Sequence, residues 1–263
     1  MTLSVFSLFF RTALARTLVG GAAGVLLAAS AAAQTLAPAG AVGAGNAKVG
    51  QGIAQNGLPS GVLACATCHG ARGEGGPAFP PLAGNGAPYL LEQLNHFANG
   101  SREQAIMYPI ANGLNAQQRA DVAAFYAGLP HPQSPVTQRQ APATPQDAGA
   151  WLVQRGRWSD GIPACAQCHG PDGLGVGEHF PAISGLNAAY MQNQISAWKT
   201  GKRPPGPLQL MSTVAQKLTP EDITAVAAYY ARLHGGGAVA AAGSSAPAPA
   251  TTPQSASSMQ GKP

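Results

Sequence analysis

Charged residues are scarce in this sequence, and their scarcity excludes several classes of protein. Only 10% of the 263 residues are Asp, Glu, Lys or Arg, far below the roughly 25% that is typical of globular domains. The chain is therefore neither a coiled coil nor a solvated acidic or basic tail. The formal net charge of +5 is spread thinly, so we expect no nucleic-acid partner, which would need a basic patch or stripe.

Aromatic side chains and strand patterns are also sparse. The chain has three Trp, six Tyr and seven Phe, which is few for a length that suggests one or two domains. Apolar residues do not alternate over the length of a strand anywhere, which argues against a β-sheet. Something other than aromatic side chains must complete the cores, and the cysteines indicate what it is.

The two ends of the chain do not have the composition of a folded domain. Residues 1–33 carry Arg11 and Arg16, no acidic residue, and an apolar run that ends in three alanines, which is typical of a secretory signal peptide. The alternative is a retained membrane anchor, but the run is just short of the roughly 20 residues that a span needs. We expect cleavage, a mature protein in the periplasm without a membrane span, a flexible spacer at 34–44 and a disordered Ala/Ser/Pro tail at 235–263.

The middle of the chain is an internal repeat of about one hundred residues. Cys-Ala-Thr-Cys-His-Gly at 65–70 recurs as Cys-Ala-Gln-Cys-His-Gly at 165–170. A Phe-Pro pair, a Gly, a Tyr, a Gln and a second Gly recur 101 residues later, as Phe79-Pro80, Gly84, Tyr89, Gln93, Gly100 and Phe180-Pro181, Gly185, Tyr190, Gln194, Gly201. These matches predict two tandem domains, at 45–130 and 147–234, joined by a Pro-rich linker at 131–146.

Within each copy the apolar spacing is helical. Asn115 and Thr219 are expected N-caps of the last helix of each copy. We expect an all-α fold in which each copy has three or four short helices. The expected helices lie near 47–55, 89–97 and 115–129 in the first copy, and near 147–155, 190–198 and 219–234 in the second.

Cys-x-x-Cys-His is the attachment motif of c-type haem. Two cysteines three residues apart can bond the two vinyl groups along one edge of the porphyrin, and the following His then faces the iron. The motif occurs in both copies and uses every cysteine of the chain. We therefore predict two covalently bound haem c groups, with thioether links from Cys65, Cys68, Cys165 and Cys168, and iron bound by His69 and His169.

Three other uses of these cysteines fit the pattern less well. A zinc site made of two Cys-x-x-Cys pairs usually separates them by about 15–20 residues, whereas Cys68 and Cys165 are 97 residues apart. A thioredoxin-type pair belongs beside a strand–helix–strand unit, for which there is no pattern. A structural disulfide is possible in a secreted protein but does not explain the His that follows both pairs.

The sixth iron ligand separates an electron carrier from a catalyst, because a Met thioether closes the site and raises the potential. Met107 and Met211 occupy equivalent positions of the repeat and are the expected axial ligands. Met191 has Leu90 at its equivalent position and is expected in the core. The other distal candidates, His96 and His179, have no equivalent in the opposite copy.

Two further features lie near these motifs. The backbone carbonyls of Pro80 and Pro181 are candidates to accept the second N–H of the proximal imidazoles, which would fix the rings; the alternative is a rigid turn. The group Lys199, Lys202 and Arg203 is either a solvated loop or a docking site for an acidic partner.

With these motifs, the sequence resembles a class I cytochrome c duplicated in tandem, and most closely the periplasmic dihaem cytochromes of the c4 type. The resemblance implies two cytochrome c domains and an electron-transfer protein of the respiratory chain rather than an enzyme; a dihaem peroxidase is disfavoured by Met in both copies. It implies single-electron transfer from a quinol-oxidising complex or other donor to a terminal oxidase or other acceptor. The alternative is the cytochrome subunit of a periplasmic dehydrogenase or reductase complex.

Overall fold

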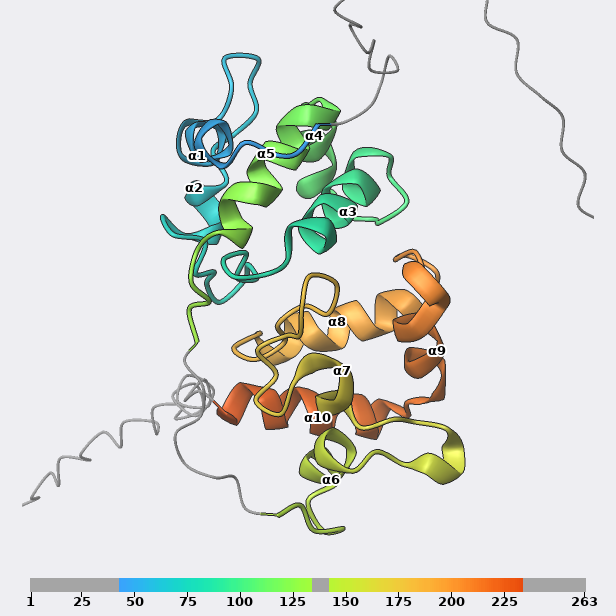
Figure 1. The fold of residues 1–263 in the computed structure, drawn as a ribbon. Helices are drawn as coiled ribbons and strands as arrows, with labels where there is room; N and C mark the ends of the chain where they lie inside the picture. Colours follow the sequence, from blue (N-terminus) through green and yellow to red (C-terminus); the bar gives the residue numbers. More distant parts are fainter. Residues whose placement is uncertain (1–42, 134–141, 234–263) are drawn as a thin grey trace, which may run out of the picture. The chain divides into compact units, whose positions relative to one another are not determined.

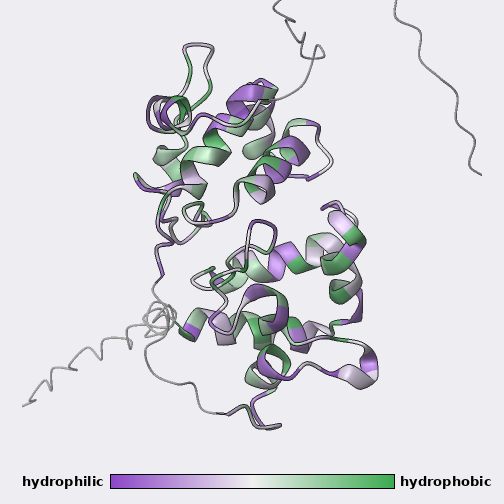
Figure 2. Cartoon of the chain, in the orientation of Figure 1, coloured by the Kyte–Doolittle hydropathy of each residue, from purple (hydrophilic) through white to green (hydrophobic). Residues whose placement is uncertain are grey.

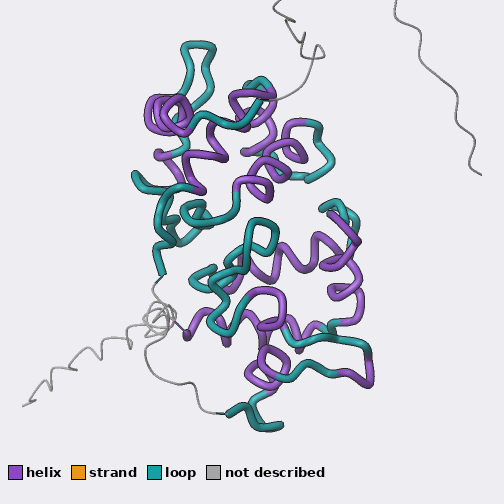
Figure 3. The backbone as a smooth tube through the Cα atoms, viewed as in Figure 1, coloured by secondary structure: helices purple, strands orange, loops and turns teal. Residues whose placement is uncertain are grey.

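The computed structural model describes residues 43–133, here called lobe 1, and residues 142–233, here called lobe 2. Both consist of helices joined by loops (Figures 1 and 3). In these two ranges there is no strand, and β-type pairing is limited to two isolated bridges, Arg157 with Ile162 and Val176 with Phe180. All described residues belong to one compact unit.

Several predictions concern residues outside the described ranges. These are the signal peptide at 1–33, nearly all of the spacer at 34–44, the tail at 235–263, and the part of the linker that covers residues 134–141. None of the described helices is long and apolar enough to cross a lipid bilayer.

Each lobe contains five α-helices. In lobe 1 they are α1 (Ala47–Asn56), α2 (Ala66–His69), α3 (Ala87–Ala98), α4 (Met107–Asn112) and α5 (Ala116–Ala127). In lobe 2 they are α6 (Ala148–Gln154), α7 (Cys165–His169), α8 (Ala188–Lys199), α9 (Leu210–Lys217) and α10 (Pro220–Leu233), with 3₁₀ turns at Trp158–Asp160 and Pro207–Gln209.

The three helices expected in each copy are present, as α1, α3 and α5 and as α6, α8 and α10. The four that the pattern did not predict are short: α2 and α7 contain the Cys-x-x-Cys-His motifs, and α4 and α9 contain Met107 and Met211. Helices α2, α4 and α7 have four to six residues, which is too few to show a 3.6-residue apolar period. Helix α9 has eight residues, one more than the predicted α6, and length does not explain why it was missed.

The expected N-caps are also present. The Asn115 side chain accepts the backbone N–H of Gln118 at 2.9 Å, and the Gln118 side chain accepts the Asn115 N–H at 2.9 Å. The Thr219 hydroxyl accepts the Asp222 N–H at 3.2 Å, and the Asp222 carboxylate accepts the Thr219 N–H at 3.0 Å. Both C-terminal helices thus begin with a capping box, which satisfies backbone donors that have no partner within the helix.

In each lobe the first and last helices pack against each other, α1 on α5 and α6 on α10. Glycines permit the close approach. A Cβ at Gly50 would lie 1.9 Å from the Asp121 carbonyl oxygen, and one at Gly149 would lie 2.4 Å from the Ala225 carbonyl oxygen. Any larger residue would force these helices apart.

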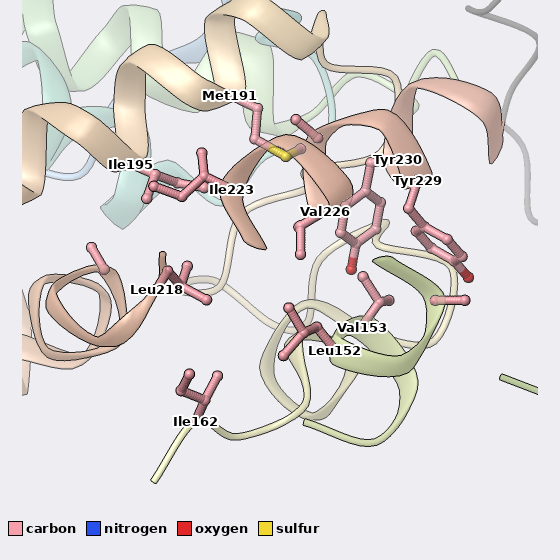
Figure 4. Packing of buried hydrophobic residues seen from close by; sticks show 13 residues of the cluster. Leu152, Val153, Ile162, Met191, Ile195, Leu218, Ile223, Val226, Tyr229 and Tyr230 are labelled. Atoms are coloured by element: carbon pink, nitrogen blue, oxygen red, sulfur yellow. The ribbon is translucent and has the colours of Figure 1, made fainter. Parts of the chain in front are cut away.

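The third helix of each lobe, α3 or α8, completes the core against the C-terminal helix. In lobe 2, Met191 lies in the buried cluster with Ile223 and Tyr230 (Figure 4), so its expected place in the core is confirmed. Polar and apolar residues share most helices (Figure 2), as is expected when one face of a helix is buried and the other faces solvent.

Candidate functional site

The Cys-x-x-Cys-His motif of lobe 1 is a short helical turn. Residues three apart lie on the same face of a helix, so Cys65 and Cys68, at the start and inside of this turn, are presented together. Both are free thiols and are partly exposed. His69 ends the turn and is only 7% exposed, so two accessible thiols stand beside one buried imidazole.

A backbone carbonyl orients this imidazole. Nδ1 of His69 lies 2.8 Å from the carbonyl oxygen of Pro80. Because a carbonyl can only accept, Nδ1 carries the proton and Nε2 is left as the nitrogen with a free lone pair. This is the form of imidazole that binds a metal through Nε2.

Lobe 2 repeats the arrangement closely. Cys165 and Cys168 lie in α7 as free thiols, and His169 ends the helix with 7% exposure. Its Nδ1 donates to the Pro181 carbonyl oxygen at 2.7 Å. The hydrogen bond suggested by the sequence at the two Phe-Pro positions is therefore present in both lobes.

Burial sets the protonation of these groups. It lowers the pKa of both His69 and His169, against the opposite effect of the proline carbonyls, and so keeps the rings neutral. It raises the pKa of the Cys65 thiol, and that of Cys165 to about 11. Reactive redox pairs of the thioredoxin type have a lowered cysteine pKa, so these cysteines do not resemble such a pair.

The glycine loop after each motif lies against a buried tyrosine. Gly73 and Gly173 adopt left-handed backbone conformations, and a Cβ at either would lie 2.5 Å from a ring carbon of Tyr126 or Tyr230. The buried hydroxyl of Tyr230 has no hydrogen-bond partner among the described residues. Glycine-rich loops, an unpaired buried hydroxyl, paired thiols and a neutral imidazole fit a covalently bound haem c.

The two methionines named from the repeat stand at the start of their helices. Met107 is the first residue of α4 and Met211 the second of α9, and both are half-buried. In each lobe the imidazole and the thioether thus come from different elements. The rejected distal candidates differ from them, since His96 is half-buried within α3 and His179 is exposed in a loop.

The basic group at 199–203 is not one surface patch, so the expectation of a solvated loop is wrong for two of its three residues. Lys199 donates to the backbone carbonyls of Ala215 and Leu218, at 3.0 and 2.7 Å. Arg203 is buried, with 6% exposure, and only Lys202 has a mostly exposed side chain.

Arg102 was not among the predicted site residues, and it is buried in the same way as Arg203. The signal was available: the two arginines are 101 residues apart and each comes two residues after a matched glycine of the repeat.

Comparison with known proteins agrees with this geometry. A sequence model of the cytochrome c family matches residues 47–129 and 162–233. The chain is 44% identical to the thiosulfate dehydrogenase electron acceptor of Thiomonas intermedia, covering 66% of this chain and 80% of the relative. It is 41% identical to the protein of the same name from Stutzerimonas stutzeri, covering 68% and 83%. It is 34% identical to cytochrome c4 of Pseudomonas aeruginosa, covering 73% and 90%.

Two solved structures have a similar fold. The thiosulfate dehydrogenase TsdBA from Marichromatium purpuratum matches with a TM-score of 0.62 and 36% identity. The match covers 71% of this chain and 40% of that longer chain. Reduced recombinant cytochrome c4 from Pseudomonas stutzeri matches with a TM-score of 0.58 and 33% identity, covering 71% of this chain and 98% of that one.

The helical lobes and their paired motifs define an all-α c-type cytochrome with two haem-binding units. The chain belongs to the cytochrome c family, in which it is a dihaem class I protein of the c4 type. It carries two covalently bound haem c groups with their iron, and it is an electron-transfer protein.

Proposed function

We propose that this cytochrome accepts single electrons from a thiosulfate dehydrogenase in the periplasm and passes them to a further redox protein. The observation that carries the proposal is its likeness to two relatives named as electron acceptors of that enzyme, which exceeds its likeness to cytochrome c4. The similarity to part of the longer TsdBA chain also supports it. Oxidation of thiosulfate then belongs to the dehydrogenase, and this chain is a carrier rather than an enzyme.

We further propose the residues that hold the two haems. Cys65 and Cys68, and Cys165 and Cys168, form the thioether bonds. His69 with Met107, and His169 with Met211, are the axial ligand pairs, while the carbonyls of Pro80 and Pro181 fix the two imidazoles. Bound haem supplies a one-electron Fe(III)/Fe(II) couple. A thioether at the sixth position leaves none for a substrate, which supports the role of a carrier.

Exposed apolar side chains surround both methionines and suit a docking partner. Ile106 and Tyr108 flank Met107 and are 53% and 47% exposed. Leu208 and Leu210 precede Met211 and are 86% and 45% exposed. The charges of each lobe are nearly balanced, so we expect the dehydrogenase to dock through apolar contact near the sulfurs, with a weak dependence of its association rate on salt.

The partner is tested by rapid mixing of the oxidised cytochrome with purified thiosulfate dehydrogenase and thiosulfate, with absorbance followed at the reduced α band. We expect complete reduction, none with thiosulfate alone, and a slower second-order rate for Leu208→Ser. Failure of the enzyme to reduce a protein that ascorbate reduces fully would overturn this assignment. A steep fall in rate with salt would contradict apolar docking.

The similarity to cytochrome c4 favours a second candidate, transfer from a quinol-oxidising complex to a terminal oxidase. Reduction by the quinol-oxidising complex and reoxidation by the oxidase, without turnover with the dehydrogenase, would select it.

The axial ligands are tested by Met107→Leu and Met211→Leu, with Met191→Leu as the matched control in the core. We expect each of the first two to leave about one of the two haems without its Met–Fe(III) absorption band and to lower the potential of that haem, since leucine cannot bind iron. The control should keep both bands. An unchanged band in either axial variant rules out that methionine as a ligand.

A further inference from the structure

The loops that hold the two imidazoles differ at one residue. Lobe 1 has Phe79-Pro80-Pro81 where lobe 2 has Phe180-Pro181-Ala182. In both, the carbonyl of the first proline accepts the Nδ1–H of the motif histidine, at 2.8 Å in lobe 1 and 2.7 Å in lobe 2. The nitrogen of that same peptide group belongs to the next residue, Pro81 or Ala182. Because proline has no N–H, only the peptide group in lobe 2 can accept at one end and donate at the other.

The peptide group in lobe 2 does donate, and its acceptor comes from lobe 1. The N–H of Ala182 donates to Oδ1 of Asn85 at 3.0 Å. The bond is buried, since Asn85 is 5% exposed and Ala182 is 8% exposed. Two hydrogen bonds therefore act in series on one peptide group, from His169 to the Pro181 carbonyl and from the Ala182 N–H to Asn85.

The Asn85 side chain is held in place by its own loop. Its Nδ2 donates to the Leu82 carbonyl oxygen at 3.3 Å and to the Pro81 carbonyl oxygen at 3.5 Å. Because a carbonyl can only accept, these contacts direct Nδ2 to lobe 1 and leave Oδ1 for lobe 2. The chain segments are also in close contact here, since a Cβ at Gly86 would lie 2.1 Å from the Glu178 carbonyl oxygen. Asn85 thus joins the two loops that orient the imidazoles.

The repeat contains no counterpart of this bond. Gly84 matches Gly185, so the residue equivalent to Asn85 is Leu186, whose side chain cannot accept a hydrogen bond. At the donor position, lobe 1 has Pro81, which has no N–H. Lobe 1 therefore lacks both the donor and the acceptor, although its imidazole is held by the same kind of carbonyl.

Hydrogen bonds in series polarise one another, and the effect is larger in a buried site of low dielectric. An acceptor at the N–H of a peptide group increases the negative charge on its carbonyl oxygen. That oxygen then draws the Nδ1 proton of the imidazole more strongly, which makes Nε2 a more basic ligand. A more basic ligand favours Fe(III) and lowers the reduction potential of the bound haem.

We propose that Asn85 of lobe 1 is a positioning residue for the haem iron of lobe 2. It acts through the peptide group between Pro181 and Ala182, strengthens the hydrogen bond to His169, and lowers the reduction potential of the lobe 2 haem. This bond makes the two haems unequal in a chain that otherwise repeats the same motif. The inference rests on the proposed axial role of His169, and it is independent of the identity of the dehydrogenase.

The test is a spectroelectrochemical titration of the holoprotein without a partner enzyme. Ala182→Pro gives lobe 2 the proline of lobe 1, and Asn85→Leu gives lobe 1 the leucine of lobe 2. Each removes the same hydrogen bond, so each should shift the lobe 2 haem about two- to tenfold toward Fe(II), the range for one hydrogen bond. For one electron, the tenfold limit is a rise of about 59 mV. The double variant should show the same shift as either single variant.

The matched control is Ala182→Gly, which changes the side chain but keeps the N–H, so both potentials should stay at their wild-type values. The lobe 1 potential should also be unchanged in Ala182→Pro. The protein with Cys165→Ser and Cys168→Ser keeps only the lobe 1 haem, and its potential identifies which of the two values belongs to lobe 2.

A wild-type lobe 2 potential in Ala182→Pro, with two haems by intact mass and both Met–Fe(III) bands retained, would overturn the proposal while leaving the axial ligands in place. Additive shifts in the double variant would show that the two residues do not act through one bond. The Ala182 amide proton gives a second readout in the reduced protein. It should move upfield in Asn85→Leu as its acceptor is lost, and an unchanged resonance would contradict the hydrogen bond. If Asn85→Leu folds poorly, Ala182→Pro and its glycine control decide the question.

Discussion

The two lobes share one architecture but stabilise it with different chemistry. The last helix begins with a capping box in both, made in lobe 1 by the neutral side chains of Asn115 and Gln118. In lobe 2 the corresponding pair is Thr219 and Asp222, and Arg157 adds two hydrogen bonds to the Asp222 carboxylate, at 2.9 and 2.6 Å. The geometry of the helix start is thus common to both lobes, while its charge is not.

The helices that begin near the two methionines, α4 and α9, show the same contrast at their C-terminal ends: the geometry is shared, and the residue that provides it differs. In lobe 1, Arg119 of α5 donates to the carbonyls of Ala111 and Leu114. In lobe 2, Lys199 of α8 donates to the carbonyls of Ala215 and Leu218. A cation satisfies the unpaired carbonyls of α4 and α9 in each case, although it comes from a different helix. The repeat therefore preserves a cationic donor at this helix end, although the residue that supplies it differs between the lobes.

The largest predicted difference follows from removing one haem at a time. We expect Cys65→Ser with Cys68→Ser to abolish the cooperative unfolding of lobe 1, and Cys165→Ser with Cys168→Ser to weaken that of lobe 2 less. Domains of under 95 residues with few aromatics are marginal without a cofactor, but lobe 2 has the larger buried cluster and the Arg157–Asp222 pair. Thermal unfolding followed by circular dichroism measures both.

Intact mass provides the control for this pair of variants, because each should contain one haem. A haem-free lobe 1 that unfolds as cooperatively as the intact protein would refute the prediction and would show that its helices form a complete core by themselves.

The second prediction concerns the charged capping box. Asp222→Asn should destabilise lobe 2 at neutral pH by about 1.5–3 kcal/mol, the range for hydrogen bonds to charged groups. The uncharged equivalent, Gln118→Ala, should cost lobe 1 about 0.5–1 kcal/mol. Urea unfolding of each variant measures the loss.

Only the destabilisation caused by Asp222→Asn in lobe 2 should depend on pH. Hydrogen bonds from Arg157, followed by those from Thr219, hold the pKa of Asp222 below its usual value. A carboxyl with a lowered folded-state pKa stabilises the fold above its unfolded pKa of about 3.9, and this contribution is lost as pH falls through the folded pKa. The difference between Asp222→Asn and wild type should therefore shrink below about pH 4, and a difference that is constant down to pH 2 would contradict the assignment.

Much of this fold and site follows from the sequence because the signals are local. The Cys-x-x-Cys-His motif, the Phe-Pro positions and the N-caps Asn115 and Thr219 each act within a few residues, and the repeat shows each signal twice. The long helices were predicted because their apolar spacing extends over three turns.

What the sequence did not predict depends on contacts between distant residues. Nothing local distinguishes the buried Arg203 from the exposed Lys202 beside it, because the burial of Arg203 comes from Trp198 and from Tyr89 and Gln93 more than one hundred residues earlier. The short helix α4 was missed for a similar reason, since its C-terminal end is satisfied by Arg119 from another helix.

The smallest predicted effect lies just before the two methionines. In lobe 1 the Gln104 side chain accepts the N–H of Ile106 at 2.6 Å and so caps the start of α4. In lobe 2, Leu208 and Gln209 have φ of 56° and 54°, the left-handed region, and no side chain caps α9.

A non-glycine residue in this left-handed region is strained by about 1–2 kcal/mol. Because glycine also gains entropy in the unfolded chain, Gln209→Gly should stabilise lobe 2 by less than about 1 kcal/mol. Gln104→Gly should instead destabilise lobe 1, since it removes a cap and relieves no strain. Urea unfolding, with the Met–Fe(III) band as the probe, measures both, and the same sign in the two lobes would show that their methionine helices begin in the same way after all.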